Sequence, residues 1–293
     1  MSSRVAVVTD TTQYLPRELL REHDVATVSL YVNDGDRHER ESEMPDFTAF
    51  YERLRTMDGA LPTTSQPSIG DFLAVFEPLL AEGRDIVSVH LAGGISGTVE
   101  SGRQAAAEAM ERHPGRRVEV VDSRSACGGM GMIVLAGAAA AEGGADVDGV
   151  KARVEEALTH ARIWFAVDTL EYLRRGGRIG TAQAWVGGAL KIKPILTVDG
   201  EIVPIERVRT ARRAFERMVD FATTLKEEQA DCWAVQHIQA PDEAARLAER
   251  CQEVLGGPPI AVSEIGPVIG THVGPGLLGV GGIPGRLVAE LRR

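Results

Sequence analysis

The sequence predicts an α/β fold with two α/β domains: a first domain around a mainly parallel, Rossmann-like sheet, and a smaller second domain around a mixed sheet. Three observations support this fold class. Short valine-rich runs alternate with helical patterns in the first half of the chain, which is typical of a parallel sheet with helices on both faces. The second half contains the pattern of a β-hairpin. A length of 293 residues suits two domains, which we place at residues 1–160 and 161–293.

The predicted elements of the first domain alternate along the chain. Strands are expected at residues 4–10, 25–32, 85–92 and 117–123, and helices at residues 46–57, 69–83 and 99–113. The longest apolar stretch, residues 132–141, is too short to span a bilayer and is typical of a buried helix.

The second domain has a different pattern. Strands are expected at residues 162–169, 232–238 and 260–266, and helices at residues 170–180, 211–228 and 242–255. Residues 194–208 have the pattern of a hairpin, with Asp199 and Gly200 as the two-residue turn.

Composition and charge exclude several classes of protein. The formal net charge of −10 argues against a nucleic-acid binder or a protein drawn to anionic membranes, because both need basic surface. The N-terminus lacks the apolar region of a signal peptide, so we expect a cytoplasmic protein. The three cysteines are scattered and odd in number, which favours reduced, core-packed thiols over a disulfide framework or a zinc site.

Three polar loops directly follow predicted strands of the first domain. They are TDTT at residues 9–12, GGISGT at 93–98 and DSRSACGG at 122–129. Because ligands of such folds bind outside the carboxyl ends of the strands, all three loops are candidates to line one rim of the sheet. Asp10 is expected to cap backbone amides of the first loop.

The GGISGT loop has two interpretations of equal weight. Its glycines and the following helix N-terminus could cradle a phosphate or carboxylate. Alternatively, it is a tight turn capped by Ser96 or Thr98. It is not a Walker loop, since no Gly-Lys-Ser/Thr ends it, and Thr98 replaces the second glycine of a nucleophile elbow. A serine hydrolase or acyltransferase using Ser96 with His272 is kept as the alternative function.

The remaining polar motifs are individually weak. His272, in THVGPG, is more often a structural hydrogen-bond partner than a catalyst, and no HxH or HExxH pair indicates a metal site. Two arginine clusters, at residues 174–178 and 207–213, are either solvated faces or a docking surface for an acidic or phosphate-bearing partner. The uncharged stretch TTSQPS, residues 63–68, has the composition of a surface loop.

Taken together, the motifs resemble the DegV family, whose members bind a fatty acid. The resemblance covers nearly the whole chain and rests on seven segments in order: VAVVTDTTQYLP, TTSQPS, GGISGTVESG, VVDSRSACGGMG, VDTLEYLRRGGRIG, LKIKPILTVDGEIVPIERVRT and EIGPVIGTHVGPGLLGV. Two features depart from the family pattern: GGIS stands where serine-rich or leucine variants are common, and Cys127 stands where a small residue is expected.

The resemblance implies a function without catalysis by this chain. Two α/β domains would enclose one long-chain fatty acid of the palmitate, stearate or oleate type, with its tail in an apolar tunnel and its carboxylate near the domain junction. No metal or other cofactor is implied. Some members act as acyl-carrier subunits of a bacterial fatty acid kinase, whose ATP-binding partner phosphorylates the acid for phospholipid synthesis.

The resemblance also implies residue roles. Thr64 or Ser65, together with Ser96, would hold the carboxylate, and His272 would complete or order that network. Arg209 would serve the kinase partner or the phosphoryl transfer, with Arg178 as the weaker candidate. Such a hydroxyl cage is physically sound, because a buried carboxylate is costly unless several donors satisfy it.

Overall fold

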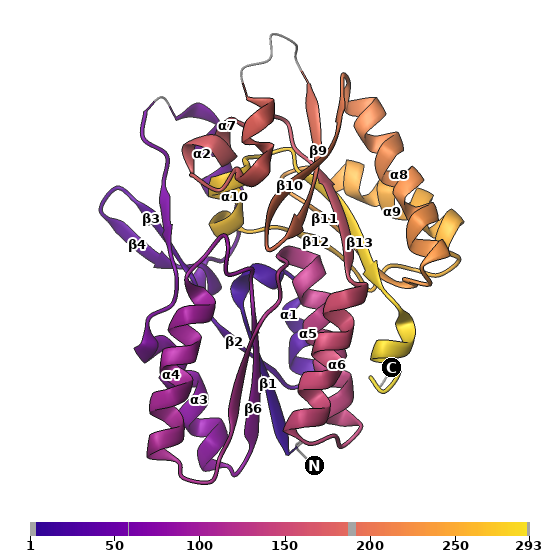
Figure 1. The fold of residues 1–293 in the computed structure, drawn as a ribbon. Helices are drawn as coiled ribbons and strands as arrows, with labels where there is room; N and C mark the ends of the chain where they lie inside the picture. Colours follow the sequence, from indigo (N-terminus) through magenta and orange to yellow (C-terminus); the bar gives the residue numbers. More distant parts are fainter. Residues whose placement is uncertain (1–3, 58, 187–191, 292–293) are drawn as a thin grey trace.

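The structure is a computed structural model that describes residues 4–57, 59–186 and 192–291. It contains a parallel four-stranded sheet, a mixed six-stranded sheet and a small antiparallel three-stranded sheet. The parallel sheet belongs to the first half of the chain and the mixed sheet to the second (Figure 1). The predicted fold class, two α/β domains with one parallel and one mixed sheet, is confirmed. The predicted limits at residues 160 and 161 stay a prediction.

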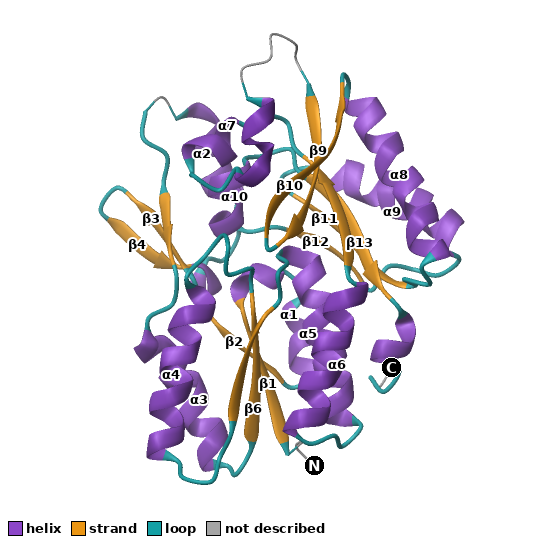
Figure 2. Ribbon diagram, in the orientation of Figure 1, coloured by secondary structure: helices purple, strands orange, loops and turns teal. Residues whose placement is uncertain are grey.

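The parallel sheet has the strand order β2-β1-β6-β7 and is covered by helices on both faces (Figure 2). Its strands are β1 (Val5–Asp10), β2 (Val25–Val28), β6 (Asp85–His90) and β7 (Val118–Asp122). Helices α3 (Ile69–Ala81) and α4 (Thr98–Arg112) pack on one face, and α5 (Cys127–Glu142) and α6 (Val147–His160) on the other. Helix α1 (Arg17–Glu22) connects the first two strands. Nearly every side chain of α5 is buried, which confirms the buried helix predicted around residues 132–141.

The prediction of one strand over residues 25–32 is wrong. The chain leaves the parallel sheet after Val28, and Tyr31–Asp34 forms β3 of the three-stranded sheet, with β4 (Arg37–Arg40) and β5 (Thr63–Ser65). The break is stabilised at Leu30, whose amide donates to Thr11 Oγ1 at 3.3 Å and whose carbonyl accepts from the Glu41 amide at 3.0 Å. Continuous β-propensity cannot reveal a change of sheet, because both pieces are extended.

The stretch TTSQPS is also more ordered than a surface loop. Thr63–Ser65 pairs with β3 in an antiparallel register that places Thr64 opposite Val32. Ser68 then begins α3 with a capping box, since its side chain accepts from the Asp71 amide and its own amide donates to the Asp71 carboxylate. The stretch is therefore held at both ends. Helix α2 (Thr48–Thr56) completes this part of the first domain.

The mixed sheet has the strand order β10-β9-β8-β13-β11-β12. Its strands are β8 (Arg162–Ala166), β9 (Lys193–Asp199), β10 (Glu201–Val208), β11 (Cys232–His237), β12 (Ala261–Glu264) and β13 (Leu278–Ile283). Helices α8 (Ala211–Glu227) and α9 (Pro241–Leu255) cover one face with an apolar core. The predicted hairpin is β9–β10, although Asp199 pairs with Glu201 and only Gly200 remains in the turn. The other face of the sheet points toward the first domain.

Several segments join the two domains. Helix α7 (Glu171–Arg175) and helix α10 (Pro267–Val273) lie next to each other above the small sheet (Figure 1). The 3-10 turn Gly285–Val288 returns to the first domain, where Arg153 of α6 donates to the Leu287 carbonyl at 2.9 Å. Among the helices of the described residues, none is long and apolar enough to cross a membrane.

Candidate binding site

A cavity of about 370 Å³ lies between the carboxyl-end rim of the parallel sheet and the uncovered face of the mixed sheet. This volume is in the range of small-molecule sites, about 300–1,000 Å³. Both domains contribute side chains, which are mostly apolar: Leu30, Leu91, Ile95, Met132, Ile163, Phe165, Leu173, Val198, Ile202, Ile265, Val268, Ile269, Val273 and Leu277. The cavity therefore suits a ligand that is largely hydrocarbon.

Strand register explains why the mixed sheet is open at this face. Gly281 of β13 pairs with Ile163 of β8 on one side and with Ala234 of β11 on the other. The central residue of this row across the sheet therefore has no side chain. In the next row, Gly279 lies between Phe165 and Gln236. Because alternate residues of a strand face the same side, both glycines expose sheet backbone to the cavity. All six residues of these two rows line it.

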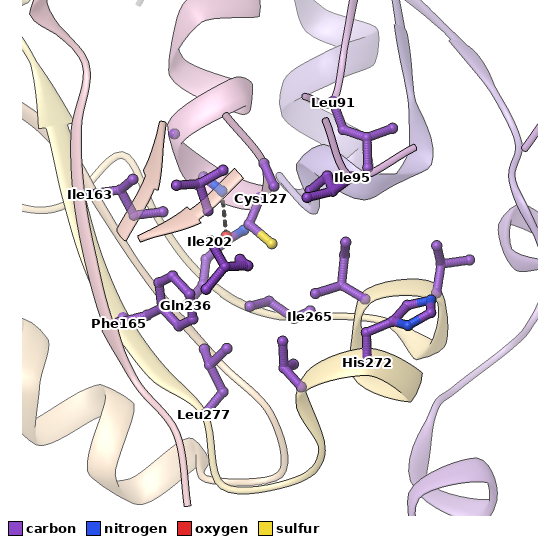
Figure 3. A pocket seen from close by; sticks show the side chains of 18 of the residues that line it. Leu91, Ile95, Cys127, Ile163, Phe165, Ile202, Gln236, Ile265, His272 and Leu277 are labelled. Atoms are coloured by element: carbon purple, nitrogen blue, oxygen red, sulfur yellow. Dashed lines mark hydrogen bonds between the residues drawn. The ribbon is translucent and has the colours of Figure 1, made fainter. Parts of the chain in front are cut away.

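The hydroxyl-bearing residues of the cavity lie near His272, whereas the polar side chain of Gln236 lies near Phe165 (Figure 3). His272 lies at one end of the cavity and Ile163 and Phe165 at the other (Figure 3). Thr64, Ser65, Ser96 and Arg178 line the cavity together with His272, so five of the six residues predicted from the sequence share one cavity. The arrangement is asymmetric, with a hydroxyl-rich end and an apolar end.

Thr64 and His272 make the main contact of the polar end. Thr64 Oγ1 lies 2.8 Å from Nε2 of His272, within hydrogen-bond distance. Strand β5 carries the threonine and helix α10 the histidine, so the contact connects the first domain to the last part of the chain. Ser65 is in the same strand, and its Oγ accepts from the Asn33 side-chain amide at 2.9 Å.

The imidazole of His272 is kept neutral by its surroundings. Burial, and to a smaller extent the positive charge of Arg178, lower the pKa of His272 to about 4. Its Nδ1 is buried and has no hydrogen-bond partner among the described residues. A Cβ at Gly176 would lie only 2.4 Å from this Nδ1, so the residue at position 176 must be glycine for the ring to remain in place.

Ser96 lies in the loop before α4 and is the third hydroxyl of the polar end. Its Oγ is 2.8 Å from Thr98 Oγ1 and accepts from the Thr98 amide at 3.3 Å. This turn geometry agrees with the prediction that Ser96 caps the turn, and the side chain still lines the cavity. Neighbouring Gly97 is tightly enclosed, since a Cβ there would lie 2.1 Å from the Gln66 side-chain oxygen.

The geometry gives no support to a Ser96–His272 hydrolase. Nε2 of His272 is hydrogen-bonded to Thr64, and Ser96 is hydrogen-bonded to Thr98. A nucleophile and its base need a mutual hydrogen bond, and within the described residues none joins Ser96 to His272. An imidazole with a pKa of about 4 is also a weak base at neutral pH.

The two predicted arginines lie in different places. Arg178 borders the polar end and donates to the Gly176 carbonyl at 2.7 Å. Arg209 is exposed and lies outside the cavity, one residue before Thr210, whose side chain caps α8 by accepting from the Arg213 amide at 3.1 Å. Only Arg178 is therefore placed to touch a ligand in this cavity.

Gln236 and Cys127 are among the cavity residues that were not predicted as site residues. Gln236 of β11 is buried, and its side-chain amide donates to the Tyr14 carbonyl and to Ser263, both at 3.0 Å. Cys127 lies at the start of α5 with a φ of 52°, a left-handed conformation that favours glycine. Burial raises the pKa of its thiol well above the usual range, so the thiol is neutral. Only the pairing of Gln236 with Gly279 shows that its side chain is on the face of the sheet that borders the cavity.

Fold and site together define a class: a two-domain α/β protein with a mostly apolar cavity at the domain junction and, at one end, a cluster of hydroxyl groups with a neutral imidazole and Arg178 beside them. Comparison with known proteins identifies the family. A family model described as "Uncharacterised protein, DegV family" matches residues 4–285. A DegV domain-containing protein of Streptomyces coelicolor is 40% identical over 283 residues, which cover 96% of this chain and 98% of that relative. The chain belongs to the DegV family.

Solved structures extend this similarity to ligand binding by relatives. A DegV family protein from Thermus thermophilus, described by its fatty acid binding, has a TM-score of 0.86 at 35% identity, covering 96% of this chain and 99% of its own. A stearic-acid-binding protein from Eubacterium ventriosum has a TM-score of 0.88 at 25% identity, covering 97% and 98%. Structural neighbours of this chain are thus fatty-acid-binding proteins.

Proposed function

We propose that this protein binds one long-chain fatty acid of the palmitate, stearate or oleate type at the junction of domains spanning residues 1–160 and 161–293. The acyl tail lies in the apolar part of the cavity, and the carboxylate lies at the polar end among Thr64, Ser65, Ser96 and His272. One observation carries the proposal: a mostly apolar cavity has its hydroxyl-bearing residues, Thr64, Ser65 and Ser96, beside His272 at one end. The fatty-acid-binding structural neighbours support it.

The energetics agree with this orientation. Each buried methylene contributes about 0.8 kcal/mol, so a sixteen-carbon tail offers roughly 12 kcal/mol as a gross upper limit. Ordering and desolvation reduce that value, and the remainder is enough for tight binding. The tail therefore supplies affinity. The head group supplies orientation, because a buried carboxylate left without donors would cost several kcal/mol.

Neutral donors have a specific advantage at this site. Hydroxyl groups and a neutral imidazole satisfy the carboxylate with single hydrogen bonds, which are weaker than ion pairs. Arg178, which borders the polar end, is the charged residue of the lining. The low pKa of His272 keeps the ring neutral at physiological pH. We infer that the acid is held firmly enough to be oriented and remains available to a second protein.

The second protein, in this proposal, is the ATP-binding subunit of a fatty acid kinase. This chain is the acyl carrier and has no catalytic role, and the acyl phosphate supplies phospholipid synthesis. Arg209 belongs to an exposed cluster with Arg207, Arg212 and Arg213, and within the described part of the chain none of the four has an ion-pair partner. Exposed guanidinium groups without a carboxylate partner, on a protein of net charge −10, favour an acidic or phosphate-bearing partner. Arg178, beside the polar end, is the second candidate for this role.

Lipid analysis of the purified protein tests the proposal. The protein is extracted with organic solvent, the extract is analysed by mass spectrometry, and delipidated protein is titrated with palmitate and oleate. We expect a co-purified or readily acquired long-chain acid in a one-to-one ratio. A protein that carries no lipid and takes up neither acid would refute the proposal. Turnover of activated esters that is lost in Ser96→Ala would instead support the hydrolase.

A further inference from the structure

A second hollow lies directly behind the apolar end of the cavity. We call it the outer groove. It has a volume of about 500 Å³ and lies between the Ser123–Ser125 loop of the first domain and strands β8 and β9 of the second. Its apolar lining includes Leu158, Ala161, Trp164 and Phe221. The rings of Trp164 and Phe221 stack with their centroids 4.4 Å apart and give the groove an apolar aromatic surface.

Ile163 and Val198 separate the two hollows. Both side chains line the cavity, and both also line the outer groove. Each is half-buried, whereas their cavity neighbours Phe165 and Ile202 are buried. The partition between the apolar end and the groove is therefore one side chain thick at these two positions.

A fork in the mixed sheet explains the thin partition. Strands β8 and β9 pair at Phe165 with Leu196 and at Ala166 with Ile195, and the described pairing goes no further toward Ile163. At that end, Thr197 Oγ1 donates to the Ile163 carbonyl at 2.6 Å. The Thr197 hydroxyl thus satisfies the Ile163 carbonyl, which would accept from a backbone amide of β9 if the β8–β9 pairing continued. The strands part there, and the side chains of Ile163 and Val198 close the opening.

The first domain holds the rim of the groove around this fork. Arg124 forms an ion pair with Asp199 at 2.8 Å, and its carbonyl accepts from the Gly200 amide at 2.7 Å. These contacts fix the end of the β9–β10 hairpin against the loop after β7. The charged side chains of Arg124 and Asp199 therefore lie at the rim of the outer groove, and the apolar side chains of Ile163 and Val198 lie where β8 and β9 separate.

We propose that Ile163 and Val198 set the longest acyl chain that this protein accommodates. This inference rests on the proposed function, because it places the terminal methyl of the bound acid against these two side chains. A chain that reaches the partition is fully enclosed. A longer chain has to displace the partition and extend through the fork into the outer groove.

Affinities for saturated fatty acids of increasing length, from laurate to behenate, test the inference. In the wild-type protein, each added buried carbon is expected to tighten binding about fourfold until a limiting length is reached. In Ile163→Ala/Val198→Ala, the increase is expected to continue to longer chains, because the fork is open. An unchanged limiting length in this variant would overturn the inference.

Further variants control for cavity volume and for folding. Ile265→Ala removes apolar bulk from the cavity away from the fork and should weaken all lengths without moving the limit. If the double variant does not fold, two conservative variants decide the question: Ile163→Val should move the limit to longer chains, and Val198→Ile to shorter ones. If neither moves it, the inference fails. Wild-type protein that binds no fatty acid would refute the proposed function itself, so the two failures are distinguishable.

Discussion

Thr64 Oγ1 lies 2.8 Å from Nε2 of His272, a contact between residues separated by 208 positions in the sequence. The threonine belongs to the edge strand of the small sheet, and the histidine to a short helix near the end of the chain. This pair defines the polar end of the cavity. It also orients Nε2 of the imidazole, whereas Nδ1 is buried and has no hydrogen-bond partner within the part of the chain that the structure describes.

Thr64→Val is expected to weaken fatty-acid binding by about tenfold, because a hydrogen bond to a charged group contributes about 1.5–3 kcal/mol and water offsets part of the loss. The change preserves side-chain shape and β-propensity. Titration of delipidated protein with palmitate measures it. Thr63→Val is the matched control, since Thr63 is exposed in the same strand. Equal affinities of the two variants would exclude a role for the Thr64 hydroxyl.

Gly176→Ala is expected to impair binding through His272. The new Cβ would lie 2.4 Å from Nδ1 of that ring, so the ring or the turn must move. We expect weaker palmitate binding and a lower Tm in the same variant. Gly257→Ala is the control, because no atom lies within 4 Å of a Cβ built there. Wild-type affinity in Gly176→Ala would show that the ring position is unimportant.

Arg209→Ala is expected to load fatty acid normally and to reduce its phosphorylation by a fatty acid kinase partner. The physical reason is that Arg209 is exposed and outside the cavity, so its loss affects only surface charge. Bound lipid and acyl-phosphate formation are measured on the same preparation. Arg103→Ala, an exposed arginine of α4, controls for net charge. A variant that still supports phosphorylation fully would refute the role proposed for Arg209.

Glu41 gives the folded protein a pH dependence near neutrality. Its carboxylate accepts from the Tyr14 hydroxyl and from the Val268 amide, both at 2.8 Å, and burial raises the pKa of Glu41 to about 7. Because the folded pKa is above the unfolded value, the stabilisation is complete below pH 4.5 and is lost as the pH rises to 7. The loss amounts to up to about 3 kcal/mol.

Urea unfolding at several pH values measures this effect. Wild-type protein is expected to lose stability between pH 5 and about 8, and Glu41→Gln is expected to lose much less over the same range. Glutamine retains an acceptor for the Val268 amide and carries no charge. Parallel pH profiles of the two proteins would show that Glu41 does not titrate in this window.

Asp10 is expected to be a stability residue of the carboxyl-end rim. Its buried carboxylate accepts from the Thr12 and Leu91 amides, at 3.0 and 3.1 Å, and lies 3.0 Å from Nδ1 of His90. Asp10→Ala leaves these donors unsatisfied and should cost about 3–5 kcal/mol. The free energy of unfolding from urea titration measures it. A loss below about 1 kcal/mol would mean that water replaces the carboxylate.

Local sequence determined the elements and the chemistry of the polar end. Alternating patterns predicted the parallel sheet and its helices, because hydrophobic periodicity reflects burial on one face. The prediction that Asp10 caps the first loop is confirmed, since its side chain accepts from the Thr12 amide. The resemblance to the DegV family, and not composition or spacing, implied a shared site for Thr64, Ser96 and His272.

Tertiary structure decided where those elements meet. The strand predicted at residues 25–32 divides between two sheets, because hydrogen bonds at Leu30 turn the chain where propensity is continuous. Gly279 and Gly281 leave sheet backbone open to the cavity, and only the strand pairing shows that they lie in the rows of Phe165 and Ile163. The partition at Ile163 and Val198 exists because two strands part. Pairing between distant segments has no local signal, so sequence patterns specify which residues are polar or apolar, and the fold alone determines which of them share a cavity.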